Sequence, residues 1–351
     1  MNRSEPRPSS KTTTEPKSNV PLLSIENLSI SFETDEGIVD VIDEVSINLE
    51  EGETLGLVGE SGCGKSVTAL AVMGLLPKPA GQVTGGVIRF EGQDLTQLTS
   101  EQLSRVRGDQ VAMIFQEPMT ALNPVHRVGK QLGESYRLHH PNASKAEIRT
   151  EALRLMDHVG IPAAERRLDE YPHQLSGGMR QRVMIAMALS SRPRILIADE
   201  PTTALDVTIQ AQILELLLDL QAEYGMSIIF ITHDLGVIAE LASRVVVMYA
   251  GRIAEEASVE TLFFSPLHPY TKGLLASIPR LESESKSVLP TIPGVVPSID
   301  ELPVGCRFSN RCEFAQDQCS NDKPLLESAT ESRTVACLRW RELEQNVVAT
   351  A

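Results

Sequence analysis

The chain has 351 residues, of which 42% are hydrophobic, enough for one core of ordinary size and a substantial extension. No run approaches the roughly 18 apolar residues that a membrane-spanning helix requires, so contact with a membrane must go through a partner or the protein surface. The net charge of −15 argues against a nucleic-acid-binding surface, which would normally be basic.

The beginning of the chain predicts a tail followed by two strands. Residues 1–20 are rich in Ser, Thr, Pro and Lys without an apolar core, so we expect a disordered tail and not a secretory signal. Residues 22–32 and 38–49 alternate well enough to predict β-strands, joined by a polar turn at residues 34–37. Phe32 could stack on an adenine ring or pack in the core of the sheet, and its position favours neither.

Residues 59–66 have the sequence GESGCGKS, which fits the phosphate-loop pattern of Gly, four residues and Gly-Lys-Ser. An apolar run at 54–58 predicts a buried strand before this loop, and residues 67–73 predict a helix after it. Because such a loop points backbone N–H groups at an anion, we expect a bound nucleoside triphosphate. Lys65 would reach the β- and γ-phosphates, and the Ser66 hydroxyl would ligate Mg²⁺. The residues assigned to the nucleotide in this stretch are Gly59, Glu60, Ser61, Gly62, Cys63, Gly64, Lys65, Ser66 and Val67.

Further strands and a helical insertion are predicted after the loop. Residues 83–90 and 110–115 have strand patterns, and the second runs into Gln116 before Glu117-Pro118 breaks it. From about residue 128 to residue 160 the pattern is mostly helical. An insertion of this kind between two halves of an α/β core suggests a helical subdomain, which we place at about residues 118–176.

Residues 175–182, LSGGMRQR, precede a helical stretch at 183–189. Ser176, Gly177 and Gly178 at the start of that helix would form a second anion-binding device, a serine cap with free N–H groups. It could close the other side of a triphosphate, within one subunit or across a dimer. A plain helix cap is the alternative interpretation.

Carboxylates follow an apolar strand at residues 195–200, ILIADE. Successive residues of a strand point in opposite directions, so Asp199 and Glu200 should have different tasks. Asp199 suits the Mg²⁺ shell, and Glu200 could orient a water for in-line attack on the γ-phosphate; a structural ion pair is the alternative. His233 follows another buried strand at 227–232 and could sense the γ-phosphate, or be structural. Together with Gln116, these side chains are expected at the carboxyl edge of a parallel sheet, where ligands bind.

These motifs, in this order over about residues 22–262, resemble the ATP-binding subunit of an ABC transporter. The resemblance implies an α/β fold with a P-loop (RecA-like) ATPase core, an N-terminal antiparallel β subdomain and a helical subdomain, within residues 21–262. It identifies Gln116 as the Q-loop, which also reaches Mg²⁺, residues 203–206 with Asp206 as the D-loop, and His233 as the switch histidine. The catalytic residues it implies are Glu200, His233 and Lys65.

In this family two such domains pack head to tail, with ATP between one subunit's phosphate loop and the other subunit's signature. Ser176, Gly177, Gly178 and Gln181 would therefore act on the nucleotide of a second ATPase subunit, for which the resemblance favours a paralogue. The other implied partners are two transmembrane permease subunits and an extracytoplasmic substrate-binding protein. The implied location is peripheral, on the cytoplasmic face of the inner (plasma) membrane.

Residues 263–345 form an extension that narrows the class. Residues 263–271, FFSPLHPYT, resemble the HPY segment of oligopeptide and dipeptide importers, and residues 292–297 resemble a further part of the same extension. Four cysteines follow with five, six and seventeen residues between them, a spacing that fits neither the usual zinc pairs nor the compact ferredoxin run. Similar subunits carry a [4Fe–4S] cluster on such cysteines, so a cluster comes first, zinc second and unligated thiols third. The cysteines are Cys306, Cys312, Cys319 and Cys337.

The sequence thus predicts an ATPase that energises import of di- or oligopeptides, with ATP, Mg²⁺ and a [4Fe–4S] cluster as cofactors. A different cargo, such as nickel chelates or antimicrobial peptides, is one alternative, because related importers share the extension. A soluble ABC ATPase of DNA repair or translation is disfavoured by the absence of coiled-coil insertions or a second ATPase unit. A regulatory module with a dead ATPase is disfavoured by Glu200 and His233.

Overall fold

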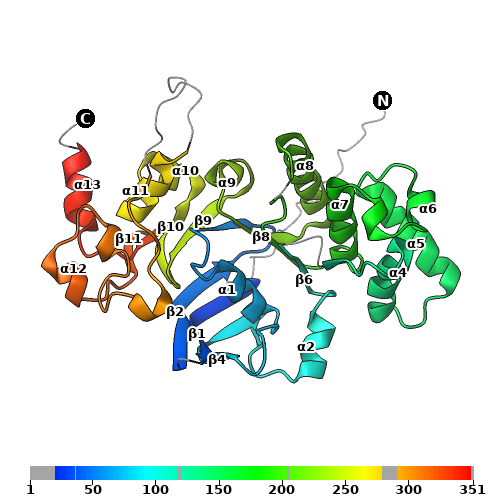
Figure 1. Ribbon diagram of the computed structural model, residues 1–351, viewed down its shortest axis with the longest axis horizontal. Coiled ribbons are helices and arrows are strands. Elements are labelled where there is room, and N and C mark those ends of the chain that lie inside the picture. Colours follow the sequence, from blue (N-terminus) through cyan, green and yellow to red (C-terminus); the bar gives the residue numbers. More distant parts are fainter. Residues whose placement is uncertain (1–19, 36, 117–120, 204, 279–290, 349–351) are drawn as a thin grey trace, which may run out of the picture.

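Two β-sheets organise the chain, and the phosphate loop lies where they meet (Figure 1). The computed structural model describes residues 20–35, 37–116, 121–203, 205–278 and 291–348. The expected disordered tail, apart from residue 20, and Glu117-Pro118 lie outside these ranges. Within the described residues no helix has the length and apolar character to cross a bilayer.

The larger sheet has eight strands, and five of them are parallel. These are, in sheet order, β6 (Val111–Ile114), β7 (Ile195–Asp199), β8 (Ser227–Thr232), β3 (Thr54–Val58) and β9 (Arg244–Tyr249). Every residue of β3, β7 and β8 is buried, as expected for parallel strands covered on both faces. Their carboxyl ends therefore share one edge, which confirms the expectation for the motifs that follow them.

The smaller sheet is antiparallel and covers one face of the larger sheet. Its strands are, in sheet order, β2 (Gly37–Leu49), β1 (Leu23–Thr34), β4 (Gly81–Phe90) and β5 (Gln93–Asp94). Its apolar face packs with β3 and with α1 (Lys65–Val72) in one core, which includes Leu23, Ile25, Leu55 and Val72. The predicted antiparallel subdomain is thus present, with α2 (Ser100–Val106) after it.

A group of helices follows, as predicted from the helical pattern after residue 128 (Figure 1). The group contains α4 (Val128–His139), α5 (Lys145–His158), α6 (Ala164–Arg167), a short 3₁₀ turn at Pro172–Gln174 and α7 (Gly177–Ala188). Leu132, Leu155 and Val183 are buried where α4, α5 and α7 meet. Two further helices, α8 (Val207–Tyr224) and α9 (Leu235–Leu241), flank the parallel strands.

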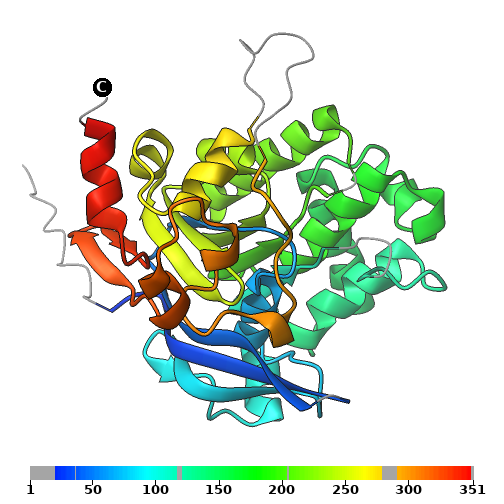
Figure 2. The ribbon, with the colours of Figure 1, turned by 60° about the vertical axis from the view of Figure 1, so that its left-hand side comes forward.

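The C-terminal segment continues the larger sheet (Figure 2). β10 (Arg252–Ser258) pairs antiparallel with β9, and β12 (Arg333–Val335) and β11 (Glu327–Thr330) extend that edge. The remaining elements are α10 (Val259–Phe264), α11 (Pro269–Ala276), 3₁₀ turns at Ile299–Glu301 and Ser309–Arg311, α12 (Asp317–Asn321) and α13 (Trp340–Val348). The segment that the sequence marks as an extension therefore shares hydrogen bonds with the ATPase sheet.

Candidate functional site

The phosphate loop joins β3 to α1 and requires glycine at two positions, each of them in close contact with a different sheet. Gly59 has φ 150°, and a Cβ added there would lie 2.2 Å from the carbonyl oxygen of Met248. Gly64 has φ 102° and precedes the first turn of α1, and its Cβ would lie 2.4 Å from the side chain of Ile42. Both sheets thus press on the loop, so its shape depends on residues from both of them.

Lys65 lies inside this loop, with only 5% of its surface exposed. Its Nζ donates hydrogen bonds to the carbonyl oxygens of Gly59 (2.8 Å) and Glu60 (3.1 Å). The Cys63 thiol lies 3.7 Å from Nζ, and burial raises the pKa of Cys63 even though Lys65 acts in the opposite direction. The ammonium group is therefore held by loop carbonyls, beside a thiol that stays neutral.

Ser66 and Asp199 form an oxygen pair at the start of α1. The Ser66 hydroxyl donates to Asp199 Oδ1 at 3.0 Å. Asp199 ends β7 and is buried, and burial raises its pKa, with a smaller contribution in the same direction from Glu200. A hydroxyl and a carboxylate are ligands that Mg²⁺ accepts, and a bound cation would offset the cost of burying the charge. The donor set therefore fits Mg²⁺.

Glu200 is held by side chains from three separate segments. Its carboxylate accepts hydrogen bonds from Gln116 Nε2 at 3.1 Å and from Thr203 Oγ1 at 2.9 Å. His233 Nδ1 lies 3.4 Å from its other oxygen. Burial raises the pKa of Glu200, but the hydrogen bonds of Thr203 and His233 outweigh burial, and the pKa lies below its usual value. The carboxylate is therefore ionised and directed, as a group that accepts a proton from water must be.

The backbone of Glu200 is also constrained. It has φ 45°, in the left-handed region that non-glycine residues rarely occupy. Its N–H donates to Ile231 O in β8 at 2.9 Å, so the neighbouring strand fixes this turn. The sequence reasoning placed Thr203 in the D-loop but missed its contact with Glu200. A hydroxyl residue three positions after a carboxylate at a strand end is the signal that could have indicated it.

The signature lies on the helical part of the molecule, apart from the loop of its own chain (Figure 1). Ser176 and Gly177 are exposed, and the Ser176 hydroxyl accepts from Met179 N at 3.3 Å as the cap of α7. A Cβ added at Gly178 would lie 2.7 Å from Ile209 on α8. Gln181 is only 1% exposed, and its Nε2 has no hydrogen-bond partner within the described part of the chain.

The remaining predicted nucleotide and D-loop residues have structural partners of their own. Asp206 caps α8, because its Oδ1 accepts from Ile209 N at 2.9 Å. Phe32 is half-buried at the end of β1, and a Cβ added at Gly81 would lie 2.9 Å from its ring. The ring therefore packs on the smaller sheet with part of its surface open.

The four late cysteines line one small cavity of about 20 Å³. Cys306 N donates to Cys319 O at 2.8 Å, which joins the two loops that carry them. Burial raises the pKa of Cys306 and of Cys337 to about 11. Within the described residues, however, no three His, Cys, Asp or Glu side chains are grouped closely enough to hold a metal ion. The donors share a cavity without forming a closed metal site.

The extension also contacts the phosphate loop itself, which the sequence reasoning missed. Glu60 N donates to Tyr270 Oη at 2.8 Å, and Arg311 donates to both carboxylate oxygens of Glu60, at 2.7 and 3.0 Å. These residues are 210 and 251 positions from Glu60, and no local pattern indicates such pairs.

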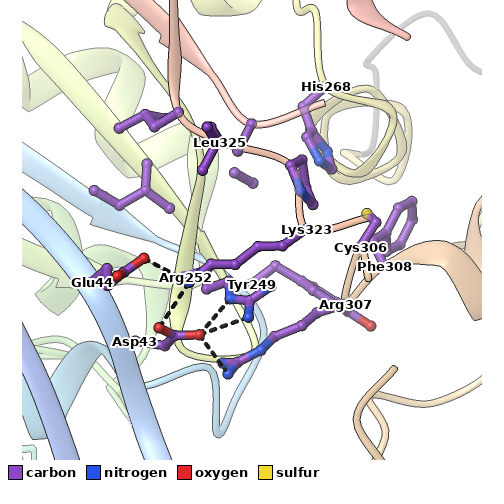
Figure 3. A pocket seen from close by; sticks show the side chains of 15 residues that line it. Asp43, Glu44, Tyr249, Arg252, His268, Cys306, Arg307, Phe308, Lys323 and Leu325 are labelled. Carbon is purple, nitrogen blue, oxygen red and sulfur yellow. Dashed lines mark hydrogen bonds and ion pairs between the residues drawn. The ribbon is translucent and has the colours of Figure 1, made fainter. Parts of the chain in front are cut away.

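A second set of contacts joins the extension to β2 (Figure 3). Asp43 of β2 accepts from two residues of the extension, Arg307 at 3.1 Å and Lys323 at 3.0 Å, and also from Arg252 in β10 at 2.8 Å. Burial raises the pKa of Asp43, but Arg252 and Lys323 outweigh burial and lower it below the usual value. Arg307 also donates to the carbonyl oxygen of Ala250, in the turn between β9 and β10. The extension therefore contacts the smaller sheet at Asp43 and the larger sheet at Ala250.

Family models match two parts of the chain. Residues 42–203 match the model described as ABC transporter, and residues 254–319 match the model described as oligopeptide/dipeptide transporter, C-terminal region. The two matched stretches contain the phosphate loop and the first three late cysteines, respectively.

Curated relatives and solved structures agree with these matches. The chain is 51% identical over 328 residues (93% of this chain, 97% of the relative) to a protein of Sinorhizobium fredii named a probable peptide ABC transporter ATP-binding protein. It is 50% identical over 321 residues (92% and 97%) to an oligopeptide transport ATP-binding protein of Bacillus subtilis. A dimeric ATP-binding cassette, solved in a post-hydrolysis state bound to ADP and Pi, has a TM-score of 0.61 at 28% identity, covering 68% of this chain and 98% of that one.

Proposed function

The chain belongs to the ATP-binding proteins of peptide ABC transporters, and from this premise we propose how its residues share the work of ATP hydrolysis. It is the ATPase subunit of an importer that takes up peptides. The phosphate-loop residues from Gly59 to Val67 surround the phosphates, and Lys65 turns from the loop carbonyls toward the β- and γ-phosphates. Ser66, Asp199 and Gln116 hold Mg²⁺, and Phe32 offers its open part to the adenine ring.

Glu200 carries the chemistry in this proposal. A lowered pKa keeps it ionised, and its two oxygens are positioned by Gln116, Thr203 and His233. It orients a water in line with the γ-phosphate and draws off a proton as the bond forms. His233 is 63% exposed, so it is free to turn from Glu200 to the γ-phosphate when ATP binds. The single observation that supports this role is the convergence of three segments on one carboxylate.

The site is completed by a second ATPase subunit. Ser176 and Gly177 are exposed on the helical part, and a related cassette of the same fold was solved as a dimer bound to ADP and Pi. We place Ser176, Gly177 and Gly178 on the partner's nucleotide, with the D-loop of Asp206 beside them. Gln181 is buried in this monomer, so its contribution would require α7 to repack on dimerisation. The partner is proposed to be a paralogue.

Membrane permease subunits are the other partners, as membership of this family implies. Next to Gln116, Phe115 is 41% exposed and lines an apolar hollow of about 240 Å³ with Met113, Leu122, Met184 and Met187. We propose that a permease segment fills this hollow and that Gln116 reports the nucleotide state to it. Two permeases and an extracytoplasmic substrate-binding protein would complete the complex, with this subunit on the cytoplasmic face of the inner membrane. Co-purification with hydrophobic subunits tests this arrangement.

We assign the residues from 263 to 345 to an extension that carries a [4Fe–4S] cluster on Cys306, Cys312, Cys319 and Cys337. The support is the donor chemistry: four thiols line one cavity of about 20 Å³, and thiolates are the ligands of such clusters. The thiols are not grouped as a metal site in the described structure, so they would have to draw together around a bound cluster. When bound, a cluster would supply structural support or a redox-sensitive group. Iron and acid-labile sulfide in protein purified without oxygen would support this assignment, and stoichiometric zinc or no metal would contradict it.

The substitution Glu200→Gln tests the catalytic assignment. It keeps the size and one carbonyl oxygen but removes the charge, so ATP turnover in the assembled transporter should fall by about a hundred-fold or more while ATP binding persists. Turnover is measured as phosphate release at saturating ATP, and binding by titration of the full-length subunit. Unchanged turnover would exclude Glu200 as the base.

A further inference from the structure

Glu60 is fixed at three points, and only one of them belongs to the loop itself. Its carbonyl oxygen accepts from Lys65, its N–H donates to Tyr270, and its carboxylate receives both Nη atoms of Arg311. The last two contacts come from the extension. An N–H group and a carboxylate on one residue, both held from the same distant segment, fix the position and the rotation of that peptide unit.

Tyr270 and Arg311 are themselves buried and held by several contacts. Tyr270 is fully buried, with its ring 4.7 Å from that of Tyr249 and 5.4 Å from that of Phe308. The Arg311 side chain is 4% exposed, lies over the ring of Tyr249 at 5.8 Å, and donates through Nε to Pro293 O at 2.9 Å. Two buried side chains with several packing partners can hold a loop in place, whereas exposed side chains would follow it.

The other side of the loop is held through the turn between β9 and β10. Gly251 N donates to Cys63 O at 2.9 Å, and the preceding carbonyl, of Ala250, accepts from Arg307. Arg307 belongs to the same C-terminal segment as Arg311. The extension therefore supports the phosphate loop near its first residue and again near its middle.

We propose that Arg311 and Tyr270 are positioning residues for ATP: they hold Glu60, and with it the backbone of the phosphate loop from which Lys65 turns to the phosphates, in the geometry that receives the triphosphate. This proposal rests on the assignment of residues 59–66 to the phosphates. Neither residue touches the nucleotide. Without them the loop would sample several shapes, and ATP would have to order it on binding.

The matched pair Arg311→Lys and Arg333→Lys tests this role. Each replaces a buried arginine of the extension that pairs with a glutamate outside it, and lysine cannot make both bonds of the guanidinium in either place. Arg311 donates to both oxygens of Glu60, and Arg333 donates through Nε and Nη2 to one oxygen of Glu255. The partner of Arg311 is in the loop, whereas the partner of Arg333 is Glu255 in β10. We expect Arg311→Lys to raise KM for ATP by about five- to ten-fold, with kcat at saturating ATP within about two-fold of wild type. Arg333→Lys should lower Tm and leave KM unchanged.

Tyr270→Phe and Glu60→Gln test the two contacts that the extension makes with Glu60. Tyr270→Phe removes the acceptor of the Glu60 N–H, and Glu60→Gln keeps a single acceptor for Arg311, so both should raise KM for ATP in the same direction. These variants keep the proposal testable if Arg311→Lys fails to fold. An unchanged KM in all three, with Tm lowered as in Arg333→Lys, would overturn the positioning role. A wild-type complex without ATP turnover would instead refute the proposed function.

Discussion

Asp199 and Glu200 are neighbours, yet their pKa values shift in opposite directions. Both carboxylates lose hydration, but only Glu200 has a hydroxyl and an imidazole directed at its oxygens. Asp199 has one hydroxyl donor, Ser66, and lies beside the negative charge of Glu200. Asp199 is therefore costly to ionise unless a cation is bound beside it, whereas Glu200 is stable as an anion and can accept a proton from water.

This difference predicts a stabilising substitution at a functional residue. Because burial raises the pKa of Asp199 in the folded state, its ionisation opposes folding once the pH exceeds the ordinary value of 3.8. Asp199→Asn keeps an acceptor for Ser66 without the charge, so the metal-free subunit should gain about 1–3 °C in Tm at neutral pH. The measurement is thermal unfolding with EDTA from pH 4 to pH 8.

The sign of the pH dependence provides the check. The gain should vanish at acid pH, where Asp199 is protonated in both the folded and the unfolded state, grow as the pH rises from 3.8 toward the folded-state pKa, and stay constant above that pKa. A gain that is equal at both ends of the range would mean that charge burial is not its cause. ATP turnover should be lost in the same variant, because the cation loses its carboxylate.

At the scale of elements, the signature helix α7 can approach α8 closely because Gly178 has no side chain. The sequence interpretation assigned Gly177 and Gly178 to free N–H groups, but Gly178 also makes room for Ile209, which a Cβ would approach to 2.7 Å. Ile209 lies in the first turn of α8, which the D-loop residue Asp206 caps, so the signature helix packs directly against the start of the helix that follows the D-loop. The glycine at position 178 of the signature is therefore required by packing against α8 as well as by the free N–H groups.

Gly178→Ala should therefore destabilise the subunit by about 1–3 kcal/mol through overpacking, seen as a lower Tm. Adding Ile209→Ala removes the opposing side chain and should restore part of that loss. The comparison is a double-mutant cycle of Tm values with Ile209→Ala alone as the control. Additive effects would contradict the packing explanation.

The strands and motif positions were predictable because they depend on local patterns. The period of two in residues 22–49, the apolar runs before each motif and the rule that ligands lie at strand ends brought Gln116, Glu200 and His233 to one place, as the structure has them. The support of Glu60 was not predictable. Tyr270 and Arg311 are 210 and 251 residues away, and their approach depends on how the extension folds back.

At the scale of the whole molecule, the extension is joined to the ATPase sheet by a buried ion pair. Glu255 in β10 is fully buried and accepts from Leu267 N and His268 N, both at 2.9 Å, and from Arg333 at 2.7 Å. Two backbone donors alone leave most of the charge uncompensated, so the ion pair makes the extension part of the fold of residues 21–262.

Arg333→Gln should therefore cost about 3–5 kcal/mol, because it leaves a buried carboxylate without its cation. Glu255→Gln together with Arg333→Gln should cost less than Arg333→Gln alone, since no uncompensated charge remains. Thermal or urea unfolding of the two variants measures the difference. A double variant that is less stable than the single one would refute the charge explanation and imply that the side-chain shapes matter more.

The ion pair between Glu60 and Arg311 joins residues that are 251 positions apart in the sequence. A ribosome adds about 5–20 residues per second, so roughly 10–50 s separate the synthesis of Glu60 from that of Arg311. During this interval the loop has been synthesised but its distant support has not. We expect a nascent chain to bind ATP weakly until it is nearly complete. Nucleotide-driven pairing of subunits would then wait for the finished protein, which protects unfinished chains from premature assembly.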